Sequence, residues 1–226
     1  MKGKLIVIEG TDCSGKETQS DLLVEYLNFR GFKTKKFAFP NYKSPTGKII
    51  AGPYLGKEGY LPPLFEEGAS NVDPYCASLL YAMDRKYNIK EIEDCLNVGI
   101  NVVLDRYIDS NMAHQGSKLN SEKREQMFYF IEKLEYELLN LPKADLPILL
   151  YMPTWASTEL KRNRREKPDQ HEMNVEYIKR SEETYLQIAK RRHSKIIECT
   201  QGNTILPIEE ISKNLCNFVE TWINEN

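Results

Sequence analysis

The sequence has no apolar run long enough to cross a membrane, and it has no excess of either charge. Its 31 Lys and Arg residues are nearly balanced by 33 Asp and Glu residues, which gives a formal net charge of −2 and a pI near 6.0. No general attraction to nucleic acid is expected, so any anion-binding site must be local. No secretory signal precedes the first apolar run, and we expect a cytoplasmic protein with no membrane partner.

Cysteine is also scarce, and its spacing excludes the common metal and redox motifs. The five cysteines form no CxxC pair and no metal-ligand pattern: Cys13, Cys76, Cys95, Cys199 and Cys216. We expect reduced thiols, most of them small buried side chains. The 226 residues are enough for a single domain over 1–226 with a small insert.

A phosphate-binding loop is the strongest signal in the chain. An apolar run at residues 5–8 is followed by GTDCSGK at 10–16 and then by a helical pattern at 21–29. In the spacing GxxxxGK, backbone N–H groups hold phosphate oxygens and the lysine supplies a point charge. A plain glycine turn is the alternative, but the lysine and both glycines are in register. We expect nucleotide contacts from Gly10, Thr11, Asp12, Cys13, Ser14, Gly15, Lys16, Glu17 and Thr18.

Glu17 departs from the usual phosphate-loop pattern, which has Ser or Thr after the lysine to join the Mg²⁺ shell. Thr18 cannot replace that hydroxyl simply, because one residue rotates a helical side chain by about 100°. Glu17 either accepts hydrogen bonds from Mg²⁺-bound water or points to solvent while Asp12, Asp105 and water hold the metal. We slightly favour the first interpretation.

The remaining pattern predicts alternating strands and helices. Strands are expected at 5–8, 33–39, 100–105, 147–152 and 195–199, and helices at 21–29, 74–97, 121–140, 154–165, 173–192 and near the C-terminus. The fold class is therefore α/β, a five-stranded parallel sheet with helices on both faces in three layers. Residues 40–73, rich in Gly, Pro and Tyr, are expected to cover the strand ends as a surface insert.

Two helices have specific expected faces. In the helix at 121–140, the core stripe is Met127, Ile131, Leu134 and Leu138, and it requires no chemistry. In the last helix, the residues expected to face inward are Ile211, Leu215, Phe218 and Trp222.

Asp105 and Arg106 follow the third strand directly. A carboxylate at a strand end beside a phosphate loop is typical of a second acidic element that orders Mg²⁺, and a guanidinium there suits capture of a second phosphate. An ordinary surface ion pair between the two is the minority alternative.

A basic segment at 161–172, KRNRREKPDQHE, precedes the helix expected at 173–192. Such a run is usually a solvated helix end. Beside a phosphate loop, we favour a short mobile lid that closes over a triphosphate and neutralises the transferring charge. Its candidate catalytic cations are Arg162, Arg164 and Arg165.

Several ordered motifs resemble the thymidylate kinase family over residues 3 to 220. They are EGTDCSGKET (9–18), FP (39–40), LLYAMDR (79–85), LDRYIDSNMAHQG (104–116), LPKAD (141–145) and DQHE (169–172). The resemblance implies a P-loop kinase that uses Mg²⁺ and moves the γ-phosphoryl group of ATP to dTMP, for dTTP synthesis. It also implies a homodimer.

The resemblance assigns roles to individual residues. Asp12 would lie near the acceptor sugar and the metal, Arg106 would hold the acceptor phosphate, Tyr81 would stack on the base and Arg85 would donate to it. The implied acceptor set is Asp12, Phe39, Tyr42, Tyr81, Arg85, Arg106, Ser110, Asn111, His114 and Gln115, with Asn111 and Gln115 at the base edge and Ser110 in support. The catalytic set is Lys16, Asp12, Arg106 and the lid arginines, and the metal set is Asp12, Glu17, Asp105 and Glu172.

Departures from the family pattern leave other functions open. Cys13 stands where some relatives have a catalytic arginine, so the cation must come from elsewhere, and the lid is the candidate. His114 replaces a familiar aromatic residue near the sugar. The alternatives are a kinase for another monophosphate, such as dUMP or a purine, and a GTP-dependent switch. The switch is disfavoured because PKAD at 142–145 lacks the Asn of the guanine motif and precedes its strand.

Overall fold

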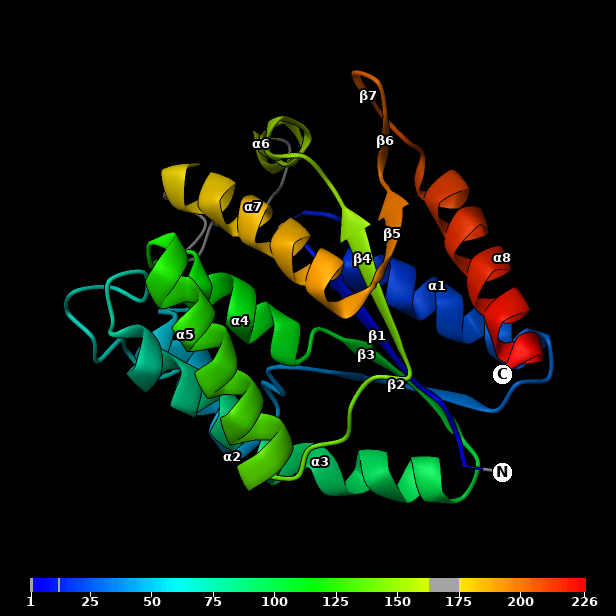
Figure 1. Cartoon of the computed structure of the whole chain (residues 1–226), viewed down its shortest axis with the longest axis horizontal. Coiled ribbons are helices and arrows are strands. Elements are labelled where there is room, and N and C mark those ends of the chain that lie inside the picture. Colours follow the sequence, from blue (N-terminus) through cyan, green and yellow to red (C-terminus); the bar gives the residue numbers. More distant parts are fainter. Residues whose placement is uncertain (1, 12, 163–174) are drawn as a thin grey trace.

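The computed structural model describes residues 2–11, 13–162 and 175–226, and it contains five parallel strands between two layers of helices (Figure 1). Asp12, Arg164, Arg165 and Glu172 lie outside the described residues, as does the side chain of Arg162. In chain order the elements are β1 Leu5–Gly10, α1 Lys16–Phe29, β2 Thr34–Ala38, α2 Pro45–Ile49, π-helical η1 Ile50–Tyr54, α3 Pro74–Asn97, β3 Asn101–Asp105, α4 Ile108–Gly116, α5 Ser121–Glu132, π-helical η2 Lys133–Leu138, β4 Leu146–Tyr151, α6 Thr154–Arg162, α7 Val175–Arg192, β5 Lys195–Glu198, β6 Thr200–Gln201, β7 Thr204–Ile205 and α8 Ile208–Glu225.

The main sheet has the strand order β2-β3-β1-β4-β5, with every neighbouring pair parallel. The central strand β1 is therefore hydrogen-bonded on both sides, to β3 and to β4. Ile8 is level with Asp105, and Gly10 is level with Leu150. The loops that follow β1, β3 and β4 thus leave the same edge of the sheet. The predicted five-stranded parallel sheet is confirmed.

Alternate residues of the strands enter two separate cores. Leu5 and Val7 of β1 face a layer that includes α3, α4, α5 and α7, whereas Ile6 and Ile8 face α1 and α8. Figure 1 shows α1 and α8 together on one side of the sheet. All six residues of β1 are buried, as expected for a parallel strand covered on both faces.

The helix expected at 121–140 differs from the prediction in its second half. It is α-helical only to Glu132 and continues as the π-helix η2, in which the Leu139 N–H donates to the Leu134 carbonyl five residues earlier. The wider turn changes which side chains face inward. Leu138, predicted in the core stripe, is 66% exposed, and Glu135 is fully buried instead.

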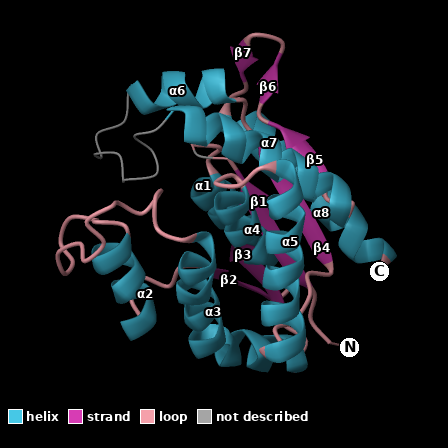
Figure 2. Ribbon diagram, turned by 60° about the vertical axis from the view of Figure 1, so that its left-hand side comes forward, coloured by secondary structure: helices cyan, strands magenta, loops and turns pink. Residues whose placement is uncertain are grey.

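The insert at 40–73 contains α2 and η1, and it has a small core with α3, built on Ile50, Tyr54 and Val72. Figure 2 shows α2 and its long following loop standing apart from the sheet, beside α3. Asp84 of α3 anchors this insert. Its buried carboxylate accepts hydrogen bonds from the Asn41 N–H at 2.8 Å and the Thr46 hydroxyl at 2.6 Å.

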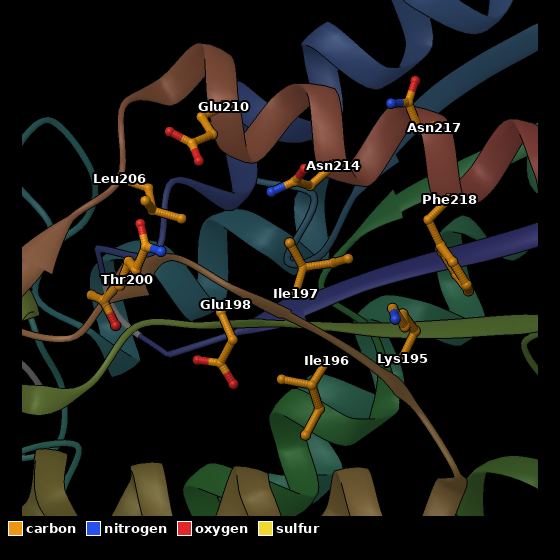
Figure 3. Close-up of a pocket in the computed structure, with 11 residues that line it drawn as sticks. Lys195, Ile196, Ile197, Glu198, Thr200, Leu206, Glu210, Asn214, Asn217 and Phe218 are labelled. Carbon is orange, nitrogen blue, oxygen red and sulfur yellow. The ribbon is translucent and has the colours of Figure 1, made fainter.

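The sequence prediction missed α4 and the hairpin of β6 and β7, and it started the first helix five residues late. No helix in the described part of the chain is both long enough and apolar enough to span a bilayer. A cavity of about 450 Å³ lies along β5 and α8, and Figure 3 shows side chains from both elements pointing into it. None of its lining residues belongs to the predicted site.

Candidate active site

The phosphate loop begins where β1 ends, and its path depends on two glycines. A Cβ at Gly10 would lie 2.5 Å from Ser14 Oγ and 2.7 Å from the Leu150 carbonyl oxygen, so only glycine fits beside β4. Gly15 precedes α1 with a φ of 74°, in the left-handed region that favours glycine. No side chain of the described residues caps the N-terminus of α1, which leaves a helix end of the kind that binds phosphate.

Lys16 lies across this loop. Its Nζ donates to the Thr11 carbonyl oxygen at 2.8 Å and lies 3.4 Å from Ser14 Oγ, and the side chain is 6% exposed. The Thr11 hydroxyl donates to the Met152 carbonyl at 2.7 Å, which ties the loop to the end of β4. The lysine charge is therefore held within the loop. Glu17, one residue further, is exposed on the first turn of α1.

A buried hydrogen-bond cluster joins β1 to α4. The Glu9 carboxylate accepts hydrogen bonds from the backbone N–H groups of Tyr107 at 2.8 Å and Ser110 at 3.0 Å, and from the Ser110 hydroxyl. Arg106 Nη1 lies 3.3 Å from both Ser110 Oγ and the Tyr185 hydroxyl. Burial raises the pKa of Glu9 from 4.5 to about 7. The cluster fixes the direction of Arg106.

Asp105 and Arg106 lie at the sheet edge beside the phosphate loop. The Arg106 N–H donates to the Ile8 carbonyl at 3.0 Å, and its φ of 66° turns the chain away from the sheet. Asp105 is 9% exposed, and its Oδ1 is buried with no hydrogen-bond partner among the described residues. The two side chains do not form the surface ion pair that was the alternative: no salt bridge joins them within the described part of the chain.

Asn111 and Gln115 lie one turn apart on α4 and are both buried. Asn111 Nδ2 donates to the Ser78 carbonyl at 3.2 Å and to Glu135 Oε1 at 3.0 Å. Its Oδ1 has no partner among the described residues, and neither amide atom of Gln115 has one. Buried polar atoms are nearly always hydrogen-bonded, so these three atoms form an edge suited to a polar ligand.

Arg85 reaches the same region from α3. Its guanidinium forms a two-point ion pair with Glu135, in which Nε contacts Oε2 and Nη2 lies 2.6 Å from Oε1. Arg85 Nη1 also lies 3.4 Å from the Tyr107 carbonyl oxygen. Both side chains of the pair are at most 2% exposed. Arg85, Asn111 and Glu135 therefore form one buried polar group.

Two aromatic side chains predicted at the acceptor site lie against other rings. Tyr81 meets Tyr54 of the insert edge to face, with centroids 5.8 Å apart. The His114 ring stacks on Tyr177 of α7, and its Nδ1 lies 2.9 Å from the Tyr177 hydroxyl. His114 thus connects α4 to the helix that follows the predicted lid.

The other two aromatic residues of the predicted set lie nearer the insert and the core. Phe39 is buried in the core next to Tyr107, with ring centroids 6.0 Å apart. Tyr42 packs against Tyr60 within the insert, and the Lys57 ammonium lies 5.0 Å from its ring centroid. Phe39 is therefore a core residue that packs against Tyr107, the residue that follows Arg106.

Sequence reasoning missed three buried acidic side chains that organise the site. Glu9 and Asp84 lie inside the quoted motifs EGTDCSGKET and LLYAMDR, so the motifs contained a signal. Glu135 lies outside every motif, at a position that helical periodicity assigns to a polar face. Among the described residues, no group of three or more Asp, Glu, His or Cys side chains gathers as a metal cluster.

Comparisons with known proteins identify the family to which the sequence is similar. The family model of thymidylate kinase matches residues 8–211. A thymidylate kinase of Plasmodium falciparum is 39% identical over 122 residues, which cover 54% of this chain and 52% of that protein, so the match spans about half of its length. One from Prochlorococcus marinus is 32% identical over 206 residues, which cover 89% of this chain and 91% of that protein.

A solved structure agrees as well. The thymidylate kinase of Candida albicans superposes with a TM-score of 0.73 at 26% identity, and the match covers 100% of this chain and 94% of that one. The glycine and lysine positions of the phosphate loop, the Asp105–Arg106 strand end and the family match over most of the sequence have one common explanation. The chain belongs to the thymidylate kinase family.

Proposed function

We propose that this enzyme transfers the γ-phosphoryl group of ATP to dTMP, giving dTDP and ADP. The phosphate loop and α1 bind the triphosphate, and Lys16 leaves its contacts in the loop to reach the terminal phosphates. Phosphoryl transfer needs two anions aligned and their charge cancelled more than it needs a strong base. Arg106 is placed to bind the second anion, the acceptor phosphate, because the Glu9–Ser110 cluster holds it at the sheet edge beside the loop.

Mg²⁺ fits this site through Asp105, whose buried Oδ1 has no partner within the described part of the chain. Mg²⁺ in kinases is held by one or two carboxylates together with phosphates and water, so a cluster of protein ligands is not required. When bound, the ion supplies charge neutralisation to the phosphates. Asp12 and Glu172, also in the predicted metal set, lie outside the described residues, and the exposed Glu17 is a candidate for contacts through water.

The single observation that carries the acceptor assignment is the unpartnered amide edge on α4. Asn111 Oδ1 and both polar atoms of Gln115 are buried and have no hydrogen-bond partner among residues 2–11, 13–162 and 175–226. A nucleobase edge has donors and acceptors in one plane, and it would satisfy them. Arg85 on the facing helix and the ring of Tyr81 complete a polar and aromatic surface suited to a pyrimidine.

We further propose that 1–226 is one kinase domain, with the acceptor insert at about 40–73 and the lid at about 161–172. The separate small core of the insert and its anchor on Asp84 support the first assignment. The lid lies mostly outside the described residues, so its arginines remain candidates from the sequence.

A homodimer is also part of the proposal. Leu79, Met83 and Tyr87 recur every fourth residue on α3, and they are 49%, 40% and 62% exposed. An apolar stripe of this kind on a helix that also carries the buried Arg85 suits packing against a second copy.

All five cysteines are thiols rather than disulfides, which supports a reducing, cytoplasmic compartment.

The acceptor assignment is tested by an ADP-release assay with ATP and a panel of dTMP, dUMP, dCMP, AMP and GMP. We expect the highest kcat/KM with dTMP. Higher kcat/KM with AMP or GMP would contradict the assignment. Comparing ATP with GTP by thermal shift separates a kinase from a GTP-dependent switch.

A substitution of Gln115 tests the observation that carries the assignment. In Gln115→Leu, an unsatisfied buried amide is replaced by an apolar group of similar size, so the free energy of unfolding should not fall. The KM for dTMP should rise about tenfold or more because a hydrogen-bonding partner of the base is lost. Gln187→Leu, on the exposed side of α7, is the control. Lower stability with an unchanged KM would show that Gln115 is purely structural.

A further inference from the structure

Glu135 lies between Arg85 and Asn111, two residues assigned to the acceptor base, and its side chain is fully buried. One carboxylate oxygen, Oε1, accepts from both Arg85 Nη2 at 2.6 Å and Asn111 Nδ2 at 3.0 Å, while Oε2 contacts Arg85 Nε. A buried carboxylate needs such donors, because an unpaired charge in the interior is costly. This residue lies in the π-helical turn of η2, four positions after the buried Ile131.

The partners of Asn111 determine which way its amide faces. Nδ2 lies 3.2 Å from the Ser78 carbonyl oxygen and 3.0 Å from Glu135 Oε1. Both partners are acceptors only, so the NH₂ group must face them and Oδ1 must face the other way. Oδ1 is the buried atom that has no partner in the described part of the chain. The amide therefore offers a ligand an acceptor and withholds its donors.

The same carboxylate orients Arg85. Two of its nitrogens point to Glu135 and Nη1 points to the Tyr107 carbonyl. A guanidinium has five N–H donors and no acceptor, so whatever it offers beyond these contacts is a donor. Arg85 and Asn111 together offer one donor edge and one acceptor.

We propose that Glu135 is a positioning residue that sets the hydrogen-bond polarity of the base pocket and so selects bases with a ring N–H next to a carbonyl. Thymine and uracil have this pattern. Cytosine reverses it at both positions, with an unprotonated ring nitrogen next to an amino group. This inference rests on the proposed function, in which Asn111 and Arg85 face the acceptor base.

The first test compares dTMP with 5-methyl-dCMP on the wild-type enzyme. The two bases have the same outline and the same methyl group, so only the hydrogen-bond polarity differs. A site built to hydrogen-bond one pattern rejects the other strongly, and we expect kcat/KM to fall by about 10³-fold or more. Discrimination below tenfold, with normal use of dTMP, would overturn the inference and leave the proposed function intact.

The second test replaces the carboxylate by an amide in Glu135→Gln. The new amide has one acceptor oxygen, and in either orientation its NH₂ group faces a donor: Arg85 Nε at one position, or Arg85 Nη2 and Asn111 Nδ2 at the other. In the second orientation Asn111 can turn its Oδ1 toward the new NH₂ group, so the orientation of the Asn111 amide is no longer imposed. We expect the preference for dTMP over 5-methyl-dCMP to fall at least tenfold, with the KM for ATP unchanged. A purely structural role would lower activity with both acceptors equally and would leave their ratio unchanged.

Glu132→Gln is the matched control. Glu132 lies almost one turn earlier on α5 and pairs with Arg191 and Arg192, away from Arg85 and Asn111. We expect its acceptor ratio to equal that of the wild type. An equal fall in this control would overturn the inference.

Glu135→Asp keeps the charge opposite Arg85 and covers the case in which the amide variant does not fold. The shorter side chain withdraws the carboxylate from Asn111, and the acceptor ratio should fall here too. An unchanged ratio in either folded variant would overturn the inference. Failure of both variants to fold, measured by thermal denaturation, would make Glu135 a structural residue and would overturn it as well. No use of dTMP by the wild type would instead contradict the proposed function.

Discussion

Glu9 is a buried carboxyl group that titrates near neutral pH, and this has a consequence for stability. Burial, and after it the neighbouring Asp109, raise its pKa to about 7 against the lowering effects of Ser110, Arg106 and the Tyr107 N–H. Between pH 4.5 and 7 the folded protein therefore holds a proton that the unfolded chain releases. The contribution of Glu9 to the free energy of unfolding is therefore largest below pH 4.5, and it is lost as the pH rises from 4.5 through 7.

Glu9→Gln should remove this dependence. The amide can still accept from the Tyr107 and Ser110 N–H groups, so folding should be retained. We expect the difference in Tm between pH 5 and pH 7.5 to shrink by several degrees relative to the wild type, measured by scanning calorimetry. An identical pH profile in the variant would show that Glu9 does not titrate in this range.

Glu17 gives a second prediction for a single residue. Its side chain is exposed at the first turn of α1, where it could contact Mg²⁺-bound water or only solvent. In Glu17→Ala we expect a severalfold rise in the Mg²⁺ concentration needed for half-maximal activity, with dTMP saturation nearly unchanged. Glu25→Ala, an exposed carboxylate further along the same helix, is the control. A Mg²⁺ titration unaltered by Glu17→Ala would favour the solvent-facing interpretation.

The positions of site residues were predictable from sequence where spacing along the chain determines them. Gly10, Gly15 and Lys16 are close in sequence, and the structure places them as the spacing requires. Glu9 was missed because its partners lie 98 and 101 residues away. Glu135 was missed for the same reason, since its partner Arg85 is 50 residues distant.

Among the elements, Lys118 joins the end of α4 to the insert. Its Nζ donates to the carbonyl oxygens of Ala69 at 2.9 Å and Val72 at 3.0 Å. In Lys118→Met the insert loses two charged hydrogen bonds, each of which typically contributes about 1.5–3 kcal/mol. Since the insert and α4 both contribute to the acceptor site, we expect the KM for dTMP to rise about tenfold or more while the KM for ATP stays unchanged.

Lys86→Met serves as the control for Lys118, because Lys86 also donates to a backbone carbonyl, that of Leu139, and within the described part of the chain it makes no hydrogen bond to the insert. We expect wild-type KM values in this variant. Equal effects of the two substitutions on both substrates would mean that the tie from Lys118 is not specific to the acceptor side.

The elements themselves were predicted well where apolar residues form continuous buried runs. Four of the five strands of the main sheet, β1, β3, β4 and β5, lie where runs of Val, Ile and Leu were found, whereas β2 has none of these residues. The prediction of an α-helix over the second half of 121–140 was wrong, because a pattern with 3.6 residues per turn cannot anticipate a π-helical turn. Helix α4 was missed because it carries polar site residues, Ser110, Asn111 and Gln115, that are buried against the apolar expectation.

At the scale of the whole molecule, the stripe on α3 predicts assembly. Met83→Glu places a charge in the middle of Leu79, Met83 and Tyr87, where burial against a second copy would be costly. We expect a dimer for the wild type and a monomer for the variant, measured by light scattering after gel filtration. Phe29→Glu, at an 87% exposed residue on α1, should remain dimeric. A wild-type monomer at micromolar concentration would contradict the proposal.

The central position of β1 also has a consequence for how the chain is made. β1 leaves the ribosome before the other strands of the sheet, yet its partners follow 97 residues later on β3, where Leu5 pairs with Val102, and 140 residues later on β4, where Ile6 pairs with Leu146. At 5–20 residues per second, the longer delay is roughly 7 to 30 s. During that time the β4 side of this apolar strand is unpaired and open to capture by chaperones. A nascent chain stopped before residue 146 would carry the complete GxxxxGK sequence and still lack the β4 backbone on which the loop rests.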